Sequence, residues 1–288
     1  MTTAMDERKV PTRRISFEES LAHLPKHFAK DGNVFASHLL AALSSLFPDG
    51  EDFFVRSVRH FRDDITDPEL KRDVAGFIGQ EAIHGREHRE FNAKLAELGY
   101  PTDRYERWTK RSLAFRFKVA SARSNLAATA ALEHYTATIG AVLLRSPETR
   151  DLIGDENVRH LFVWHALEET EHKEVAFDVY RAVGGTERLR TLTMNGVTAG
   201  FLGSLLVQVI LSMLADRETY RLRTLRETVR AIRTTPLLSR KMWRDLRDYN
   251  QKGFHPRMHD TTGLVAEWRE KLFGEAGEIT DLLPVKAA

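Results

Sequence analysis

The chain has 288 residues and a hydrophobic fraction of 42%, which is enough to bury a substantial core. Its 43 basic and 41 acidic residues leave a formal charge of +2, so net charge gives no reason to expect a nucleic-acid partner. The absence of cysteine excludes disulfides, thiolate zinc sites, iron–sulfur clusters and a cysteine nucleophile, so any metal must be bound by His, Asp and Glu.

The first predicted elements follow a polar N-terminus. The first ten residues, MTTAMDERKV, lack the apolar run of a signal peptide, so we expect a cytoplasmic protein with a flexible tail over residues 1–15. Beyond it, apolar residues recur mostly at spacings of three and four, and this period predicts an all-α fold. Helices are expected over residues 34–47 and 51–64, separated by the break FPDG.

The next helix has clear signals at both ends. The phrase TDPELKRD supplies Asp67 as the N-cap and Pro68 at the first helical position. The helix should run to residue 97, because Gly99 and Pro101 then end it. These signals predict one long helix of about eight turns.

The middle of the chain continues the helical period. Residues 103–145 are expected to be helical throughout, with a bend allowed. The connection RSPETRDLIGDEN should contain one helical turn, and residues 157–183 form the following helix, which Gly184 and Gly185 end. How residues 99–118 bridge the two helix pairs, as a loop or as a bent helix, stays open at this point.

The last third of the chain contains an uncharged segment and a basic one. Residues 191–215 carry no charge, and their length suits a core helix, a homodimer interface or a membrane span. Residues 216–249 are rich in Arg and suit either solvent or an anionic membrane surface. We therefore expect a bundle over residues 16–186, a helical extension over residues 187–288 with a short helix near GLVAEWREKLF, and at most peripheral membrane association.

Two Glu-x-x-His pairs indicate a metal site. Glu81 and His84, like Glu169 and His172, lie three positions apart and are therefore neighbours on one face of a helix. One such pair would arise by chance in a chain with this many Glu and His. Two pairs fit the di-metal sites of ferritin-like four-helix bundles, which also need one Glu from each of two further helices.

Glu51 and Glu133 meet this requirement by their positions. Glu51 precedes the turn at Asp64 by 13 residues, and Glu81 follows Pro68 by 13 residues. In the second pair of helices, Glu133 precedes Arg145 by 12 residues, and Glu169 follows Asn157 by 12 residues. Because a helix rises about 1.5 Å per residue, equal distances from the turn place both side chains of an antiparallel pair at the same height.

Both of these glutamates also have a simpler explanation. Glu133 lies in NLAATAALEHYTATIGAVLL, where unpaired burial would be costly, but it could instead face solvent. Glu51 lies in the first turn of its expected helix, where any acid complements the helix dipole. We expect Glu168 at the surface, because it points about 100° away from Glu169.

Two further histidines lie one turn from the predicted ligands. His88 is four positions after His84, and His165 is four positions before Glu169, so each shares a helix face with a ligand. Each is a candidate for an additional ligand or a catalytic proton donor. Metal sites often recruit outer histidines that hold the ligands in place, and we expect this supporting role for both.

Five phrases together resemble the bacterial family of predicted metal-dependent hydrolases: FPDGEDFFVRSVRHF, FIGQEAIHGREHREFN, ALEHYTA, WHALEETEHKEVAFDVY and GFHPRMHD. That family is similar to the ferritin-like superfamily, so the resemblance, which covers residues 14–265, implies a ferritin-like four-helix bundle with additional C-terminal helices. It implies six metal ligands: Glu51, Glu81, His84, Glu133, Glu169 and His172. The pattern also resembles the ferritin-like arylamine oxygenases, which use an extra His.

The ligand set leads to three hypotheses about function. We favour an oxygen-activating di-iron oxidoreductase acting on an apolar small molecule, because iron suits carboxylate and imidazole ligands in a dry pocket. The alternatives are a di-metal hydrolase, as the description of the family suggests, and a non-enzymatic metal-binding protein. We expect two metal ions, with iron preferred over manganese or zinc, and the uncharged segment beside the bundle suggests a lipophilic substrate.

Overall fold

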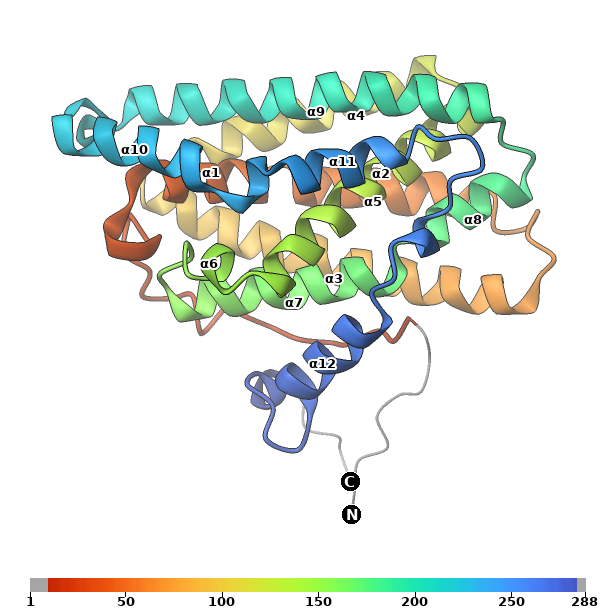
Figure 1. Cartoon of the computed structure of the whole chain (residues 1–288), viewed down its shortest axis with the longest axis horizontal. Coiled ribbons are helices and arrows are strands. Elements are labelled where there is room, and N and C mark those ends of the chain that lie inside the picture. Colours follow the sequence, from red (N-terminus) through yellow and green to blue (C-terminus); the bar gives the residue numbers. More distant parts are fainter. Residues whose placement is uncertain (1–9, 284–288) are drawn as a thin grey trace.

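Four long helices line the centre of the molecule. The computed structural model describes residues 10–283, and in it α2 (Phe47–Arg59) packs against α3 (Pro68–Glu97), while α5 (Ala122–Arg145) packs against α7 (Glu156–His172). Contacts between α2 and α5 join the two pairs, and Figure 1 shows the helices running broadly along the long axis. No β-strand occurs in the described part of the chain, so the all-α class is confirmed.

Side-chain caps explain where three of these helices begin. Asp67 accepts a hydrogen bond from the N–H of Glu69, as TDPELKRD predicts. Ser121 caps α5 by accepting from the N–H of Ser124, and Asp155 caps α7 by accepting from two N–H groups of its first turn. Each cap satisfies donors that the helix itself leaves without a partner.

The start of α2 differs from the expectation. The chain breaks at Ser45 and Leu46, after α1 (Val34–Ser44), and FPDG lies inside the first turn of α2 instead of in a loop. Pro48 is tolerated there because the N–H that it lacks has no acceptor in the first helical turn. Because α2 begins earlier than expected, Glu51 lies beyond the first turn.

The predicted helix over residues 103–145 is divided in two. α4 (Thr102–Val119) ends at Ala120, and α5 begins after the N-cap Ser121, with both residues in extended conformation. α4 packs against α2 and α3. The segment that bridges the two helix pairs is therefore itself a helix, which covers one side of the bundle.

The predicted helix over residues 157–183 is also divided. α7 ends at His172, and α8 (Val175–Ala182) follows after a turn at Lys173 and Glu174. α8 packs against α3 and α5, so it extends the bundle beyond the end of α7. The helical turn that we expect before α7 is confirmed as α6 (Pro147–Arg150).

The helices after residue 186 pack on several sides of the bundle. α9 (Glu187–Ala215) lies on α1 and α5, α10 (Leu222–Thr234) lies on α1, α11 (Arg240–Asp248) packs on α5, and α12 (Thr262–Phe273) packs on α7. In Figure 1, α9 runs along one edge of the molecule and α12 lies at the opposite edge. Single 3-10 turns occur at Lys30–Gly32, Arg217–Tyr220, Pro236–Leu238, Pro256–Met258 and Thr280–Leu282. The division of the chain at residue 186 stays a prediction.

The N-terminal segment is packed where the structure describes it. Val10 and Ile15 are buried, and Arg13 reaches the side chains of α7. The flexible tail expected over residues 1–15 is therefore wrong for residues 10–15, because Val10 and Ile15 are buried and Arg13 pairs with buried carboxylates. Residues 1–9 lie outside the described residues.

The apolar core has two parts with polar side chains between them. One part contains Phe77 of α3 and Tyr135 of α5, and the other contains Phe91 of α3 and Leu161 of α7. Glu81 lies between the two phenylalanines along α3. The polar side chains are consequently enclosed by apolar walls that keep bulk water away from them.

Candidate metal centre

Seven buried side chains converge between the two parts of the core, and we call them the glutamate–histidine cluster. They form three overlapping groups, within each of which the potential ligand atoms lie within 4.8 Å of one another. The groups are Glu51, His84 and His165; Glu81, Glu133 and His172; and Glu81, His84 and Glu169. The structure thus brings together the six ligands predicted from the sequence and adds His165.

All four central helices contribute to the cluster. α2 supplies Glu51, α3 supplies Glu81 and His84, α5 supplies Glu133, and α7 supplies His165, Glu169 and His172. Gly85 of α3 helps to bring α2 close, because a Cβ at this position would lie only 3.1 Å from Glu51 Oε2. The absence of a side chain at Gly85 leaves room for the Glu51 carboxylate.

His84 presents an unprotonated nitrogen to the cluster. Its Nε2 lies 3.0 Å from Glu168 Oε2. Burial raises the pKa of Glu168, but Arg13 donates to its other oxygen at 2.7 Å and favours the ionised form. An ionised carboxylate only accepts, so Nε2 carries the proton. Burial holds the pKa of His84 well below its usual value, which leaves Nδ1 unprotonated. Nδ1 has no hydrogen-bond partner and lies 3.8 Å from Glu169 Oε1.

His172 is oriented in the same way from another side. Gln80 donates through Nε2 to Pro11 O and to Glu171 Oε2, at 2.9 and 2.8 Å, so its own Oε1 is fixed as an acceptor. His172 Nδ1 lies 2.8 Å from this oxygen and must donate to it. Its Nε2 then faces two carboxylate oxygens of the cluster, at 3.0 and 3.2 Å.

A chain of hydrogen bonds sets the orientation of His165. Asn92 Nδ2 donates to Ser44 O at 3.1 Å, which leaves Asn92 Oδ1 to accept from the Ser44 hydroxyl at 2.6 Å. Ser44 Oγ must then accept from His88 Nδ1, 2.8 Å away. Burial keeps the pKa of His88 well below its usual value, so its Nε2 accepts from His165 Nδ1 at 2.7 Å. His165 Nε2 is left to face two carboxylates of the cluster, at 2.9 and 3.7 Å.

Most carboxylate oxygens of the cluster have no hydrogen-bond donor. Seven of these oxygens are buried without a hydrogen-bond partner: both of Glu51, Glu81 and Glu133, and one of Glu169. Burial raises the pKa of Glu81 to about 8 and that of Glu133 to about 7, and it raises the pKa of Glu51 well above its usual value. The carboxylates raise the pKa of His172 although burial opposes this. Without bound cations, the carboxylates therefore depend on protons, including those of the His172 ring, and bound cations would take over this role.

Divalent cations fit this set of donors. Carboxylate and imidazole ligands without thiolate suit iron, manganese and zinc. Each of the three histidines also has the outer hydrogen-bond partner that metal-bound imidazoles usually have. Four carboxylates bring negative charge into a buried site, and bound cations would compensate for it.

The structure corrects the expectation for Glu168 and tests two alternatives. Glu168 is fully buried beside His84, not at the surface, because Arg13 pairs with it from the N-terminal segment. Glu133 does not face solvent and Glu51 does not serve a helix dipole, since each is 1% exposed and belongs to the cluster. The two additional histidines, for which we expected the same supporting role, occupy different positions. His88 contacts His165, whereas His165 itself faces the carboxylates.

Sequence reasoning missed the outer partners of the histidines. Gln80 and Glu171 directly precede Glu81 and His172, and a polar residue beside each motif residue is the signal that could have indicated them. Arg13 has no local signal, because it lies 155 positions from Glu168 along the chain. Only the packing of residues 10–15 onto the bundle reveals it.

An apolar cavity leads towards the cluster from the side of α9. A space of about 40 Å³ touches His165 and Glu169, and it shares Phe47, Thr136 and Phe201 with a larger cavity of about 600 Å³. The larger cavity lies among α2, α4, α5 and α9, and its lining is mostly apolar. Arg116 is the only ionisable residue in that lining.

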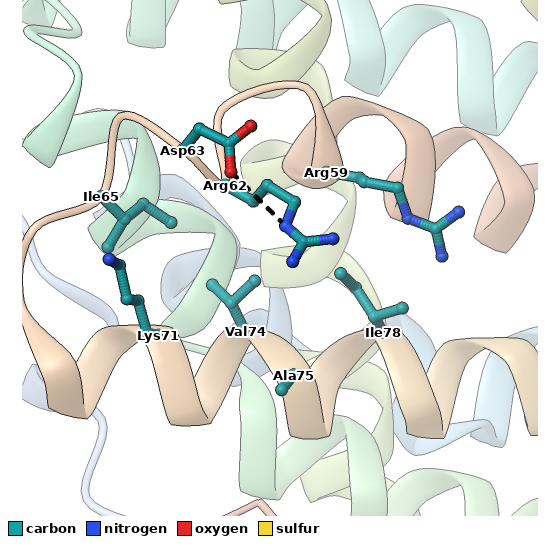
Figure 2. Close-up of a pocket in the computed structure, with 8 residues that line it drawn as sticks. All are labelled: Arg59, Arg62, Asp63, Ile65, Lys71, Val74, Ala75 and Ile78. Carbon is teal, nitrogen blue, oxygen red and sulfur yellow. Dashed lines mark ion pairs between the residues drawn. The ribbon is translucent and has the colours of Figure 1, made fainter.

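A further hollow, at the turn between α2 and α3, is separate from the cluster. It measures about 440 Å³ and shares no lining residue with the groups above. Figure 2 shows the charged side chains Arg59, Arg62 and Lys71 around apolar side chains of α3. Arg62 pairs with Asp63 at 3.7 Å, both well exposed, so this hollow holds no buried acid or base.

Comparison with known proteins gives one match. A family model described as "predicted metal-dependent hydrolase" matches residues 11–260. No curated protein and no solved structure matches the chain. The matched region contains all seven residues of the cluster.

Proposed function

Because the chain belongs to the family of predicted metal-dependent hydrolases, we propose that it is a hydrolase whose reaction depends on two divalent cations in the glutamate–histidine cluster. One observation carries this proposal: ring nitrogens of three histidines and carboxylate oxygens without hydrogen-bond partners converge in one buried volume. A cluster of four carboxylates is balanced in charge by two divalent cations, whereas a single cation would leave buried negative charge uncompensated.

The overlapping groups suggest how the residues share the cations. Glu51, His84 and His165 would hold one, and Glu133 and His172 would hold the other. The remaining two carboxylates, Glu81 and Glu169, lie between these two sets. Glu81 is grouped with His172 and also with His84. Glu169 faces His165 and His172. Ferritin-like di-metal proteins use one Glu from each of two helices and Glu-x-x-His from each of two others, and His165 would be an addition to that pattern.

The chemistry divides between the cations and the protein. Divalent cations, when bound, would lower the pKa of a water and polarise a carbonyl or phosphoryl group. The protein orients His84, His165 and His172 so that one ring nitrogen of each faces the carboxylates, and its apolar walls exclude bulk water. Arg13 compensates the negative charge of the Glu168 carboxylate and thereby lets Glu168 orient His84.

The cavity beside the cluster supports a lipophilic substrate. Its volume of about 600 Å³ and its largely apolar lining suit a molecule of the size of a typical small ligand. Arg116 donates to Ser124 but forms no ion pair with any described carboxylate, and its Nε has no partner. We propose that Arg116 binds an acidic group of the substrate, while the apolar part lies towards Phe47 and Phe201.

One observation favours oxygen activation as a second candidate. The small space next to Glu169 contains Thr136 as its only polar residue outside the cluster, so nothing else there would hold a polar leaving group. A dry, apolar environment protects reactive oxygen intermediates. An oxygen-activating di-iron oxidoreductase on an apolar molecule therefore remains the competing proposal.

One experiment separates the two candidates. The protein is purified without chelators, its metal content is measured, and cleavage of lipophilic esters and phosphoesters is assayed under argon. We expect cleavage without oxygen, its loss in Glu81→Gln and its retention in the control Glu97→Gln, which removes an exposed carboxylate from the same helix. Oxygen uptake and colour on air exposure of the ferrous protein, without cleavage under argon, would replace hydrolysis by oxygen activation.

A further inference from the structure

One face of α9 is both apolar and exposed. By length and composition α9 could cross a membrane, but core helices pass the same test. In this structure only 17% of its apolar 18-residue stretch is buried, so α9 is not a core helix. Between Leu192 and Leu214 the exposed residues recur at spacings of three and one, and they are Leu192, Asn195, Gly196, Ala199, Gly200, Gly203, Leu206, Val207, Ile210, Leu211 and Leu214.

This apolar stripe is long for the surface of a soluble protein. From Leu192 to Leu214 it extends about 33 Å at the helical rise of about 1.5 Å per residue. It contains no charged residue. Exposed apolar surfaces of this extent usually mark contact with a membrane or with another protein.

α10 adds a basic amphipathic helix beside the stripe. Leu222, Leu225, Val229 and Ile232 are exposed and recur at spacings of three and four, so they form one apolar face. Arginines flank this face: Arg221, Arg223, Arg226, Arg230 and Arg233. Glu227 is the only acid in α10, and it pairs with Arg223. A basic helix with an exposed apolar face is typical of segments that lie in a membrane interface.

We propose that α9 and α10 form a docking surface for an anionic membrane. Both helices pack on α1, so they cover the same side of the bundle, and Figure 1 shows α10 beside the C-terminal part of α9. Charge decides between this occupant and a second copy of the chain. A symmetric dimer that buries the apolar face of α10 against its own copy would bring two Arg-rich helices together, whereas anionic lipid headgroups neutralise them.

The protein lies on the membrane and does not cross it. α9 is anchored to the bundle by buried residues such as Met194 and Gln208, and α11 and α12 return to the same bundle after it. A membrane-spanning α9 would have to separate these contacts. The apolar stripe therefore enters only the outer part of the lipid layer.

Docking would open the apolar cavity towards lipid. Its lining includes Trp108 and Val207, both more than 40% exposed, and three glycines of the stripe. A lipophilic molecule could pass from the membrane between α4 and α9 towards the cluster without crossing water. This route rests on the proposed function, whereas the docking surface itself does not.

Vesicle binding of the metal-loaded, full-length protein tests the docking surface. The probes are vesicles of phosphatidylcholine alone and vesicles with an added third of phosphatidylserine, separated from free protein by sedimentation. We expect binding to the anionic vesicles that weakens as salt rises. The pair Arg226→Gln and Arg230→Gln should weaken it roughly 25-fold, since each basic residue near such a surface contributes about fivefold. Leu225→Glu with Val229→Glu should abolish it.

A matched control and a second measurement keep the result interpretable. Lys71→Gln with Arg72→Gln removes two exposed charges from α3 and should leave binding unchanged. Binding of all variants alike, or of none, would overturn the proposal. A different result would identify a second copy of the chain as the partner of this surface. In that case light scattering would show a dimer, Leu225→Glu with Val229→Glu would make it monomeric, and no variant would bind vesicles. Metal content, measured in parallel, reports on the proposed function separately.

Discussion

At the scale of single residues, hydrogen-bond geometry assigns a role to each histidine of the cluster. His84, His165 and His172 each use one ring nitrogen for a fixed outer acceptor and keep the other for the carboxylates. The side-chain amides of Gln80 and Asn92 cannot exchange their oxygen and nitrogen positions, because further hydrogen bonds hold them. The direction of the hydrogen bonds to the histidines is therefore fixed. Such outer contacts are what prepares an imidazole for metal binding.

Removal of a proposed ligand should remove metal. We expect His84→Ala or Glu169→Ala to lower bound metal from about two ions per chain towards one or none, while circular dichroism remains helical. His134→Ala is the matched control, because His134 is buried outside the cluster and binds the backbone of Asp245. Elemental analysis decides, and full metal content in both ligand variants would contradict the assignment.

His165 and His88 should respond differently to substitution. His165 faces the carboxylates, so His165→Ala should alter the ligand-field spectrum of the cobalt-loaded protein. His88 contacts only His165 and Ser44 by hydrogen bonds, so His88→Ala should weaken metal binding by about 10- to 100-fold with the spectrum unchanged. An unchanged spectrum in saturated His165→Ala would return His165 to the supporting role expected from the sequence.

The raised pKa values of the carboxylates predict how stability depends on pH. Without metal, the folded state holds protons on Glu81 up to about pH 8 and on Glu133 up to about pH 7, whereas the unfolded chain releases them near pH 4. The folded state then binds more protons, so the stability of the metal-free protein falls as pH rises. The depressed pKa of His84 acts oppositely, but only below about pH 6.5.

Thermal unfolding at about pH 6.5, 7.5 and 8.5 measures this effect. Bound cations keep the carboxylates ionised, so the metal-loaded protein should not lose stability over this range. The difference in Tm between the loaded and the metal-free protein should therefore widen as pH rises. A constant or narrowing difference would show that protons and cations do not compete for the cluster.

At the scale of elements, the segment over residues 10–15 ties two central helices together. Arg13 pairs with Glu168 and Glu171 of α7 at 2.7 Å each, and Pro11 accepts a hydrogen bond from Gln80 of α3. Burial of these two glutamates would be unfavourable without a cation nearby. The segment thus supports the cluster from outside by holding the residues that orient His84 and His172.

Loss of Arg13 should destabilise the fold as well as the site. Arg13→Gln leaves Glu168 buried beside no arginine, and we expect a loss of about 3 kcal/mol in the free energy of unfolding, measured with urea. Glu168→Gln in the same chain should restore part of it, because the uncompensated charge is then removed. Arg62→Gln, at an exposed ion pair, should change stability by less than about 1 kcal/mol. Equal effects of the two arginines would contradict this role.

At the scale of the whole molecule, α9, the larger cavity and the small space beside the cluster lie next to one another. The larger cavity begins at the exposed stripe of α9 and shares Phe47 and Phe201 with the small space beside Glu169. The route that we propose for a lipophile enters between α9 and α4, passes α2 and α5, and ends at α7.

A bulky side chain at the mouth should close this path. Gly200 lines the cavity, and a Cβ there would meet no atom within 4 Å, so Gly200→Phe should fold normally. We expect this variant to bind a fluorescent fatty acid at least tenfold more weakly than the parent protein, with metal content unchanged. Gly263→Phe, at an open site on α12, is the control. Unimpaired binding in Gly200→Phe would show that the lipophile binds elsewhere.

Local patterns in the sequence determined the all-α class and the two Glu-x-x-His pairs. Residues three or four apart meet on a helix whatever the rest of the chain does, so Glu81 and His84 share a face before any tertiary contact forms. Caps are equally local, and Asp67 begins α3 as its sequence predicts. Distances from the expected turns also indicated Glu51 and Glu133, although the helix of Glu51 ends at Arg59 and not at the expected Asp64.

Only the tertiary structure decided what surrounds these residues. The sequence placed Glu168 at the surface, since its neighbour Glu169 points to the core, but Arg13 covers it from 155 positions away. The position of His165 among the carboxylates depends on Asn92, Ser44 and His88, which belong to other helices. The exposure of one face of α9 was likewise undetermined, because an uncharged helix has the same sequence pattern whether protein or lipid covers it.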